Sequence, residues 1–261
     1  MGRVTVQKRK PKSKWKRIAA KNLKMGIKGG QELLKVLYPP VCPFCERRLF
    51  NTGVCRECMP RLPFIEGNRC MKCSKPVYAQ EIEYCMDCAK TNHSYEEGRA
   101  LFLYNALVQQ SIAGFKYKNR REFSASYSRL MIQEMGEIWR RWDCEAVIPV
   151  PVHAKKKQKR GFNQAELIAK DIGEYLCLPC DANILYRCIN TMPQKEFSPA
   201  ERRKNLEKAF KIKQNSVEYK KVLLIDDIYT TGSTVDACAD VLRQAGVQKV
   251  YFSSISIGLG I

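Results

Sequence analysis

Two adjacent carboxylates follow a short apolar run near the carboxyl-terminal end of the chain. Val222 to Ile225 are all apolar, Asp226 and Asp227 come next, and a loop of small polar residues follows. A continuous apolar run of this length is typical of a strand buried in a parallel sheet. We therefore expect both carboxylates at the carboxyl end of that strand, where open α/β sheets bind their ligands.

The loop after the carboxylates has the composition of an anion site. Its residues are Thr230, Thr231, Gly232, Ser233 and Thr234. Glycine adopts positive φ freely, and a helix beginning near residue 235 would direct its positive end at the loop. A phosphate would bind there while Asp226 and Asp227 accept hydrogen bonds from sugar hydroxyls.

An ordinary strand-to-turn junction is the alternative interpretation of this segment, because Asp and Thr are common in turns and at helix N-caps. Two carboxylates followed at a fixed spacing by five small residues favour the sugar-phosphate site. The chain contains no Gly-x-x-x-x-Gly-Lys-Ser/Thr segment, which argues against a nucleotide-driven motor within it.

Eight of the 13 cysteines occur as four Cys-x-x-Cys pairs in one short region. The pairs are Cys42/Cys45, Cys55/Cys58, Cys70/Cys73 and Cys85/Cys88. Eight thiolates fit two structural zinc sites, each tetrahedral with four sulfur ligands. An interleaved pairing fits the spacing, but sequential pairing is preferred because it requires only local loops.

A disulfide framework in a secreted protein is the alternative use of these cysteines. The lysine-rich start of the chain has no apolar signal segment, so we expect a reducing cytoplasm and metal-bound thiolates. His93 and His153 are expected to be polar loop residues. The other five cysteines are expected to be small buried apolar residues: Cys144, Cys177, Cys180, Cys188 and Cys238.

The net charge of +20 is placed unevenly along the chain. Residues 1–28 contain eleven Lys or Arg and no Asp or Glu, and further basic clusters lie at 155–160 and 202–213. Such a field attracts polyanions, and aromatic residues beside it, such as Tyr117 and Phe162, can stack on unpaired bases. The alternatives are a solvated basic tail and, less favoured, a membrane-surface helix at 15–27. No segment is apolar over the length needed to span a bilayer.

The hydrophobic pattern divides the chain into an extension at 1–30, a zinc-binding region at 31–92 and an α/β domain at 93–261, with a linker at 91–97. Strands are expected at 99–104, 145–149, 221–225 and 249–257. Helices are expected at 31–37, 106–117, 122–139, 163–176 and 235–245. Strands that alternate with helices predict a parallel sheet with right-handed crossovers.

With these elements in order, the chain resembles the ComF family of competence proteins. The resemblance covers nearly everything after residue 30, although the basic extension is longer than the family pattern requires. It rests on the cysteine pairs, on the segment from Asp226 to Thr234, and on the following residues: Leu37-Tyr-Pro-Pro-Val-Cys-Pro-Phe-Cys45, Phe115-Lys116-Tyr117, Val150-Pro-Val-His153, Arg160-Gly-Phe-Asn-Gln164, Gln194, Glu201, Arg202 and Asn205.

The resemblance implies a type I phosphoribosyltransferase-like parallel sheet flanked by helices, with a small N-terminal double zinc ribbon. It implies that Asp226 and Asp227 hold the ribose hydroxyls of phosphoribosyl pyrophosphate and that the loop from Thr230 to Thr234 holds its 5′-phosphate. The turn at 149–153 corresponds to the pyrophosphate loop of phosphoribosyltransferases, with magnesium bound beside the pyrophosphate.

The resemblance also implies a cytoplasmic role in natural transformation, in which the protein handles incoming single-stranded DNA together with other DNA-uptake proteins such as a helicase. The sequence shows no residues that read an acceptor base. An active phosphoribosyltransferase of nucleotide metabolism therefore stays open as the alternative, as does a zinc-ribbon adaptor whose sugar pocket is vestigial.

Overall fold

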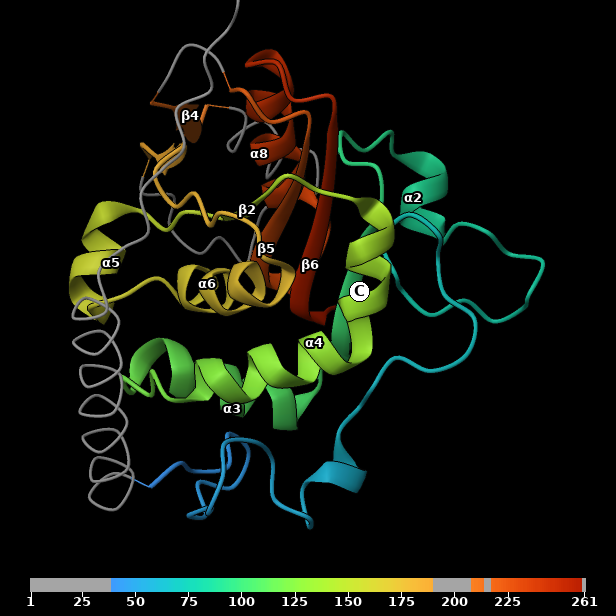
Figure 1. Cartoon of the computed structure of the whole chain (residues 1–261). Coiled ribbons are helices and arrows are strands. Elements are labelled where there is room, and N and C mark those ends of the chain that lie inside the picture. Colours follow the sequence, from blue (N-terminus) through green and yellow to red (C-terminus); the bar gives the residue numbers. More distant parts are fainter. Residues whose placement is uncertain (1–38, 190–207, 214–216, 260–261) are drawn as a thin grey trace, which may run out of the picture. The chain divides into compact units, whose positions relative to one another are not determined.

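The computed structural model describes residues 39–189, 208–213 and 217–259 of the 261-residue chain (Figure 1). The chain divides into two units, Met1–Pro40 and Val41–Ile261, and only residues 39–40 of the first are described. The basic extension and the helix expected at 31–37 therefore lie outside the described residues. So do four of the residues that carry the family resemblance: Gln194, Glu201, Arg202 and Asn205.

The core of the second unit is a four-stranded sheet in which every pair of neighbouring strands is parallel. Its strands are β1 (Gly98–Leu103), β2 (Ala146–Pro149), β5 (Lys221–Tyr229) and β6 (Lys249–Ile257), in the order β1-β6-β5-β2. These are the four strands that the sequence predicts, and the predicted parallel sheet is confirmed.

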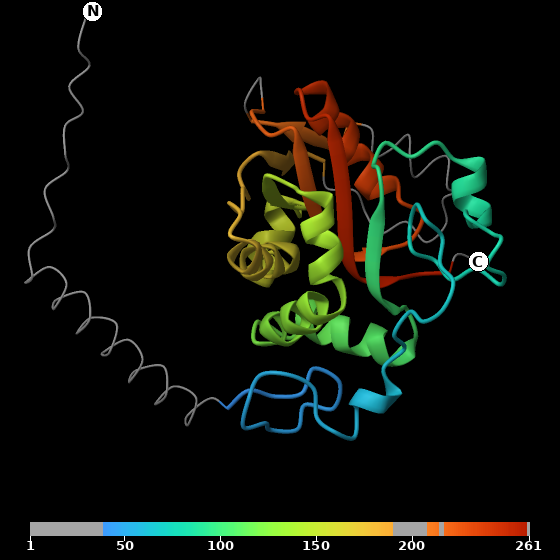
Figure 2. The same ribbon diagram turned by 45° about the vertical axis from the view of Figure 1, so that its right-hand side comes forward.

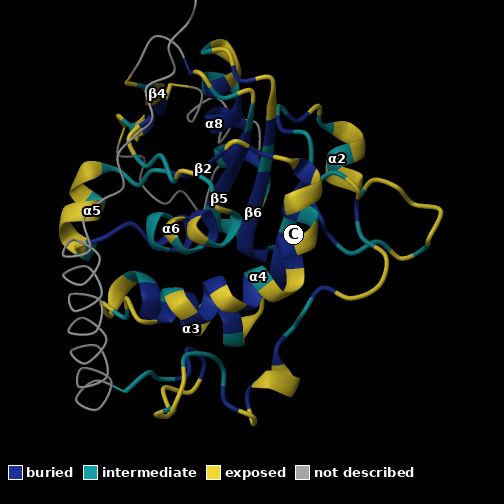
Figure 3. Ribbon diagram, in the orientation of Figure 1, coloured by how far each residue is buried: buried dark blue, intermediate teal, exposed yellow. Residues whose placement is uncertain are grey.

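Alternate residues of β5 face two separate hydrophobic cores. Leu223 and Ile225 pack with α4 (Phe123–Trp142) and α6 (Gln164–Leu176) on one face of the sheet. Val222 and Leu224 pack with α8 (Ser233–Gln244) on the other face. Successive side chains of a strand point to opposite faces, so a strand that is apolar at every position must be covered on both sides. Figure 3 shows the strands buried between helices whose outer faces are exposed.

Four further elements lie outside the sheet: two helices and two short strands. Helix α3 (Ala106–Tyr117) follows β1, and α5 (Ala154–Arg160) follows β2. Strands β3 (Leu185–Arg187) and β4 (Phe210–Ile212) form a separate antiparallel pair. The sequence predicts α3 with its observed bounds, but it does not predict α5, β3 or β4.

The cysteine-rich region is built from turns, with only the short helices η1 (Met59–Arg61) and α2 (Met86–Lys90). Its two halves join different cores. Cys42, Cys55 and Cys58 pack in the core of α4, whereas Cys70 and Cys73 pack in the core of α8. In Figure 2 the first half of the region, in blue, lies below the green helices, and the second half, in teal, lies to the right of the sheet. The division of the chain at residue 92 stays a prediction.

The segment at 91–97 is not a plain linker. His93 and Tyr95 are buried, and the N–H of Glu96 donates to the carbonyl of Val250 in β6 (2.7 Å). The segment thus extends the folded region up to the start of β1. In the part of the chain that the structure describes, no helix is long and apolar enough to cross a membrane.

Candidate functional site

Strand β2 ends beside the middle of β5. Its last paired residue is Pro149, opposite Ile225, and the N–H of Val150 donates to the carbonyl of Ile225 (2.8 Å). The next residue, Pro151, has no N–H and cannot extend the ladder. From residue 226 onward, β5 is therefore paired only with β6.

Asp226 and Asp227 occupy this half-open part of β5. The sequence predicts that the strand ends at Ile225, but pairing with β6 carries it on to Tyr229. The carboxylates thus lie within the strand and just past the end of β2, instead of after the end of their own strand. This still places them at the carboxyl edge of the sheet, where parallel α/β sheets bind ligands.

We call the carboxyl edge of the sheet at Asp226 and Asp227 the acidic edge, and a lysine from α3 contacts it. The Nζ of Lys116 lies 2.8 Å from Oδ1 of Asp227, and both side chains are more than four-fifths buried (15% and 17% exposed). Asp226 accepts the backbone N–H of Asp227 (2.8 Å). Burial, followed by the negative charge of Asp227, raises the pKa of Asp226 to about 7. The edge therefore combines one ion-paired carboxylate with one that gains and loses its proton near neutral pH.

The segment from Arg160 to Gln164 holds this edge together. Asn163 caps α6, because its Oδ1 accepts the N–H of Ala165 (3.2 Å), and its Nδ2 donates to the carbonyl of Val150 (3.0 Å). Gln164 is buried and donates to the carbonyl of Phe115 at the end of α3 (3.2 Å). These two amides fix the turn after β2 and the helix end that carries Lys116.

The small-residue loop leads directly into α8. Gly232 has φ +83° and is the N-cap of the helix, which begins two residues earlier than predicted. The hydroxyls of Thr231 and Ser233 are 2.9 Å apart. The first N–H groups of α8 have no acceptor inside the helix, so they are available to an anion in the loop.

Two residues behind the loop were missed by the sequence analysis. His93 lies 2.8 Å, Nδ1 to Oδ2, from Asp236 in the first turn of α8, and the pair is buried. His93 was expected to be a polar loop residue. Asp236 had a detectable signal, because it shares the buried face of α8 with Val235 and Ala239, where an acid is unusual.

The eight paired cysteines form two groups of four. The groups are Cys42/Cys45/Cys55/Cys58 and Cys70/Cys73/Cys85/Cys88, and in each group the sulfurs all lie within 4.8 Å of one another. This is the sequential arrangement that the sequence favours over the interleaved one.

The sulfur spacing fits zinc and does not fit disulfides. Cys45 and Cys55 have their sulfurs 3.6 Å apart, and Cys73 and Cys85 have theirs 3.7 Å apart. Tetrahedral zinc with Zn–S bonds of about 2.3 Å places its ligand sulfurs about 3.8 Å apart, whereas a disulfide bond is about 2.05 Å long. Each group supplies four thiolates, so each could hold one zinc with no coordination position left open.

The remaining cysteines are only partly as expected. Cys144 and Cys238 are buried, but Cys177 and Cys188 are exposed and Cys180 is half-buried. Cys177 is the C-cap of α6 with φ +58°, so its position follows from the end of the helix and not from apolar burial.

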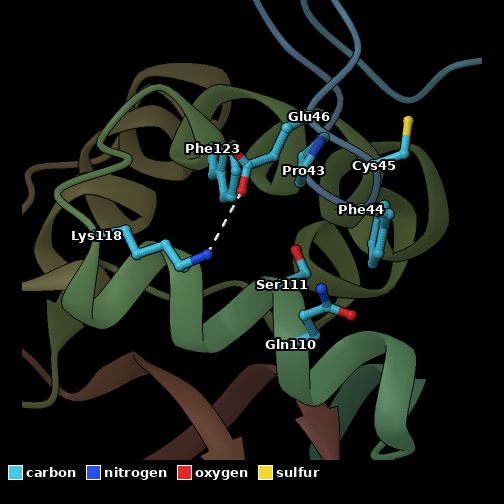
Figure 4. Close-up of a pocket in the computed structure, with 9 residues that line it drawn as sticks. Pro43, Phe44, Cys45, Glu46, Gln110, Ser111, Lys118 and Phe123 are labelled. Carbon is cyan, nitrogen blue, oxygen red and sulfur yellow. Dashed lines mark ion pairs between the residues drawn. The ribbon is translucent and has the colours of Figure 1, made fainter.

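A cavity of about 170 Å³ lies between the first cysteine group and α3 (Figure 4). It is lined by Pro43, Phe44, Cys45, Glu46, Gln110, Ser111, Gly114, Lys118 and Phe123. None of these residues belongs to the acidic edge or to the loop. The carboxylate that lines the cavity, that of Glu46, is already paired with Lys118 (3.9 Å) and Arg120. The candidate ligand site is therefore the edge of the sheet and not this cavity.

The chain is similar in sequence to a zinc ribbon family and to several bacterial proteins. A family model described as a double zinc ribbon domain matches residues 33–89. Competence protein F of Haemophilus influenzae is 29% identical over 213 residues, which cover 75% of this chain and 93% of that protein. The chain is thus similar to competence protein F over most of both chains. Competence protein ComFC of Bacillus subtilis is 26% identical (74% and 79% covered), and DNA utilization protein YhgH of Escherichia coli O157:H7 is 26% identical (81% and 94% covered).

Solved structures align only loosely with this chain. The glutamine phosphoribosylpyrophosphate amidotransferase of B. subtilis gives a TM-score of 0.35 at 16% identity, covering 55% of this chain and 30% of that one. The purine phosphoribosyltransferase of Pyrococcus horikoshii gives 0.30 at 12% identity, covering 51% and 87%. TM-scores this low do not establish a shared fold. The fold class rests on the strand order and the two cysteine groups.

The cysteine groups predict two bound zinc ions per chain. Cys42→Ser and Cys70→Ser should each reduce the zinc content from two ions to one, because a missing thiolate opens one site, and each should lower the thermal unfolding temperature. Metal analysis of the purified protein measures this. Cys177→Ser, which alters an exposed cysteine outside both groups, should keep two ions. Two tightly held ions in Cys42→Ser would contradict the ligand set.

The raised pKa of Asp226 predicts that this site costs stability. A folded-state pKa of about 7 exceeds the ordinary value of about 3.9, so the stabilisation from neutral Asp226 is fully present below about pH 4 and is lost as the pH rises through 7. Asp226→Asn stays neutral. Its melting temperature should therefore rise relative to wild type between pH 5 and pH 8, by about 2–4 °C for each kcal/mol recovered. Asp240→Asn is the charge-matched control, and a constant difference for Asp226→Asn would refute the assignment.

Proposed function

We propose that this protein binds phosphoribosyl pyrophosphate at the acidic edge and handles single-stranded DNA in the cytoplasm during natural transformation. One observation carries the binding of phosphoribosyl pyrophosphate. Asp226, Asp227 and Lys116 meet at the carboxyl edge of a parallel sheet, beside the loop from Thr230 to Thr234 at which α8 begins. The names of the relatives, competence proteins and DNA utilization proteins, support the second part.

The edge and the loop match the two halves of a ribose phosphate. Vicinal hydroxyls of the sugar donate to Asp226 and Asp227, and charge-assisted hydrogen bonds of this kind are stronger than neutral ones. The 5′-phosphate accepts from the N–H groups of the loop from Thr230 to Thr234 and the first turn of α8. Lys116 balances the charge of Asp227 and orients its carboxylate.

The pyrophosphate of the ligand would lie toward the turn after β2. This turn contains His153, which accepts the N–H of Lys155 (3.3 Å) and begins α5. Helix α5 is strongly basic, with Lys155 and Lys159 exposed. Magnesium would bind mainly to pyrophosphate oxygens and water, while the lysines contribute compensating charge.

The same corner of the molecule presents a basic surface with an exposed aromatic ring. Tyr117 is 70% exposed, and the guanidinium of Arg160 lies 4.9 Å from its ring centroid and 3.3 Å from its hydroxyl. Lys118 and Arg121 are exposed nearby in sequence. A ring held in place by a guanidinium beside exposed cations suits the stacking of unpaired bases and contact with their phosphates. Tyr117 is next to Lys116, so single-stranded DNA bound here would lie close to the acidic edge that Lys116 contacts.

Phosphoribosyl transfer is the second candidate function. The pKa of about 7 at Asp226 favours it, because a group that titrates near neutral pH can accept a proton from an attacking nucleophile. Release of pyrophosphate from phosphoribosyl pyrophosphate in the presence of a nucleobase, lost in Asp226→Asn, would establish the enzyme. Binding without release under these conditions supports the binding role.

Phosphoribosyl pyrophosphate binding should depend on the carboxylates. Asp227→Asn should weaken the affinity about 10- to 100-fold, because a charge-assisted hydrogen bond contributes roughly 1.5–3 kcal/mol. Isothermal titration with the magnesium complex measures this. Asp240→Asn on α8 removes the same charge away from the edge and should bind as wild type does. If Asp227→Asn binds phosphoribosyl pyrophosphate as tightly as wild type does, the ligand does not bind at Asp227.

Binding of single-stranded DNA should be steep in salt and should use Tyr117 and Arg160. Fluorescence anisotropy of a labelled oligonucleotide across a salt series should show Tyr117→Ala weaker by about 1–3 kcal/mol at every salt concentration. Arg160→Gln should reduce the salt slope by about 0.7. Tyr78→Ala, at a fully exposed tyrosine of the cysteine-rich region, is the matched control. If Tyr78→Ala loses as much affinity as Tyr117→Ala, the DNA surface lies elsewhere.

A further inference from the structure

The segment that follows the second cysteine group is bound to both ends of α8. At the start of the helix, Asp236 accepts from Nδ1 of His93 (2.8 Å) and from the N–H of Ser94 (3.0 Å). At the end of the helix, Arg243 donates to the carbonyl of Ser94 (2.6 Å) and forms an ion pair with Glu96 (2.5 Å). Three residues of the 93–96 segment, His93, Ser94 and Glu96, thus fix the position of the helix that begins at the candidate phosphate loop.

The bond at the start of α8 is closed to water. The side chains of His93 and Asp236 are 1% and 7% exposed, and the His93 ring stacks on Tyr95 with centroids 4.8 Å apart. In the described part of the chain, Nε2 of His93 has no hydrogen-bond partner and no solvent contact. A buried carboxylate that loses a donor is left without a substitute, which is costly. The pair therefore has one well-defined arrangement.

The pair also lies directly against the loop. A Cβ atom on Gly232 would be 3.0 Å from Cε1 of His93 and 2.6 Å from the hydroxyl of Tyr229, so the glycine backbone packs closely on both rings. Tyr229 is itself held by a hydrogen bond to the hydroxyl of Tyr95 (2.7 Å). Two residues of the 93–96 segment, His93 and Tyr95, thus determine where the backbone of Gly232 can lie.

We propose that His93 and Asp236 are a positioning pair that holds the loop from Thr230 to Thr234 in its phosphate-binding geometry. The proposal rests on the proposed function and deepens it. Neither residue touches the ligand. An array of N–H donors binds an anion best when it is already arranged for it, since no binding energy is then spent on ordering the loop. The affinity of the site for phosphates thus depends on a segment that leaves the cysteine-rich region.

The test compares the two ends of α8. His93→Phe keeps the stacking on Tyr95 but removes the hydrogen bond to Asp236, and Arg243→Met removes the bonds at the far end of the helix. Titration of each full-length variant with the magnesium complex of phosphoribosyl pyrophosphate should show about a tenfold loss for His93→Phe, equivalent to one weakened hydrogen bond. Arg243→Met should change less than about twofold. His93→Gln, which can again donate to Asp236, should recover most of the affinity.

A second readout needs no ligand. In wild type, the amide of residue 236, which donates to the carbonyl of Gly232 (2.8 Å), should exchange slowly with solvent, and its exchange should become faster in His93→Phe but not in Arg243→Met. Unchanged exchange and affinity in His93→Phe would overturn the proposal, as would equal losses in both variants. Absence of binding by the wild type would instead overturn the proposed function, and the exchange rates alone would then decide whether the pair positions the loop. If His93→Phe does not fold, Asp236→Asn replaces it in both measurements.

Discussion

The parallel ladder around β5 is the constraint on which the candidate site depends. On one side, pairing with β2 stops at Pro149 because the proline at 151 has no N–H to donate. On the other side, pairing with β6 continues to Tyr229. The strand is therefore rigid where it carries Asp226 and Asp227, yet open on the flank where β2 has ended. A rigid strand with one free flank can present carboxylates in fixed positions to a ligand.

The charges of this edge are balanced through tertiary structure and not within the strand. Asp226 and Asp227 are neighbours, and burial, followed by the negative charge of Asp227, raises the pKa of Asp226. Lys116 offsets part of the negative charge of Asp227, but it comes from α3, whose end is bound by Gln164 through the carbonyl of Phe115. Residues that resemble binding residues in the sequence thus include several whose role is to support others.

The sequence was sufficient to predict features that arise from local periodicity and spacing. The four sheet strands follow from apolar runs, and the two cysteine groups follow from pairs of fixed spacing. Helix α5 has no apolar face and could not be found this way; it is delimited by His153 at its N-cap and by Gly161, with φ +78°, at its C-cap. The bond between His93 and Asp236 joins residues 143 positions apart, and no local pattern encodes such a contact.

The division of the cysteine groups between two cores has a consequence for the order of assembly on the ribosome. Each group is complete within a short stretch of chain, so residues 42–88 can take up metal early in synthesis. Neither core can close then, because the last strand supplies Ile255 to one and Phe252 to the other, and because the edge strand β1 pairs with that same strand. The nascent chain must carry two metal-bound turns and unburied apolar surface until residue 257 has emerged, which is the interval when it is most exposed to aggregation.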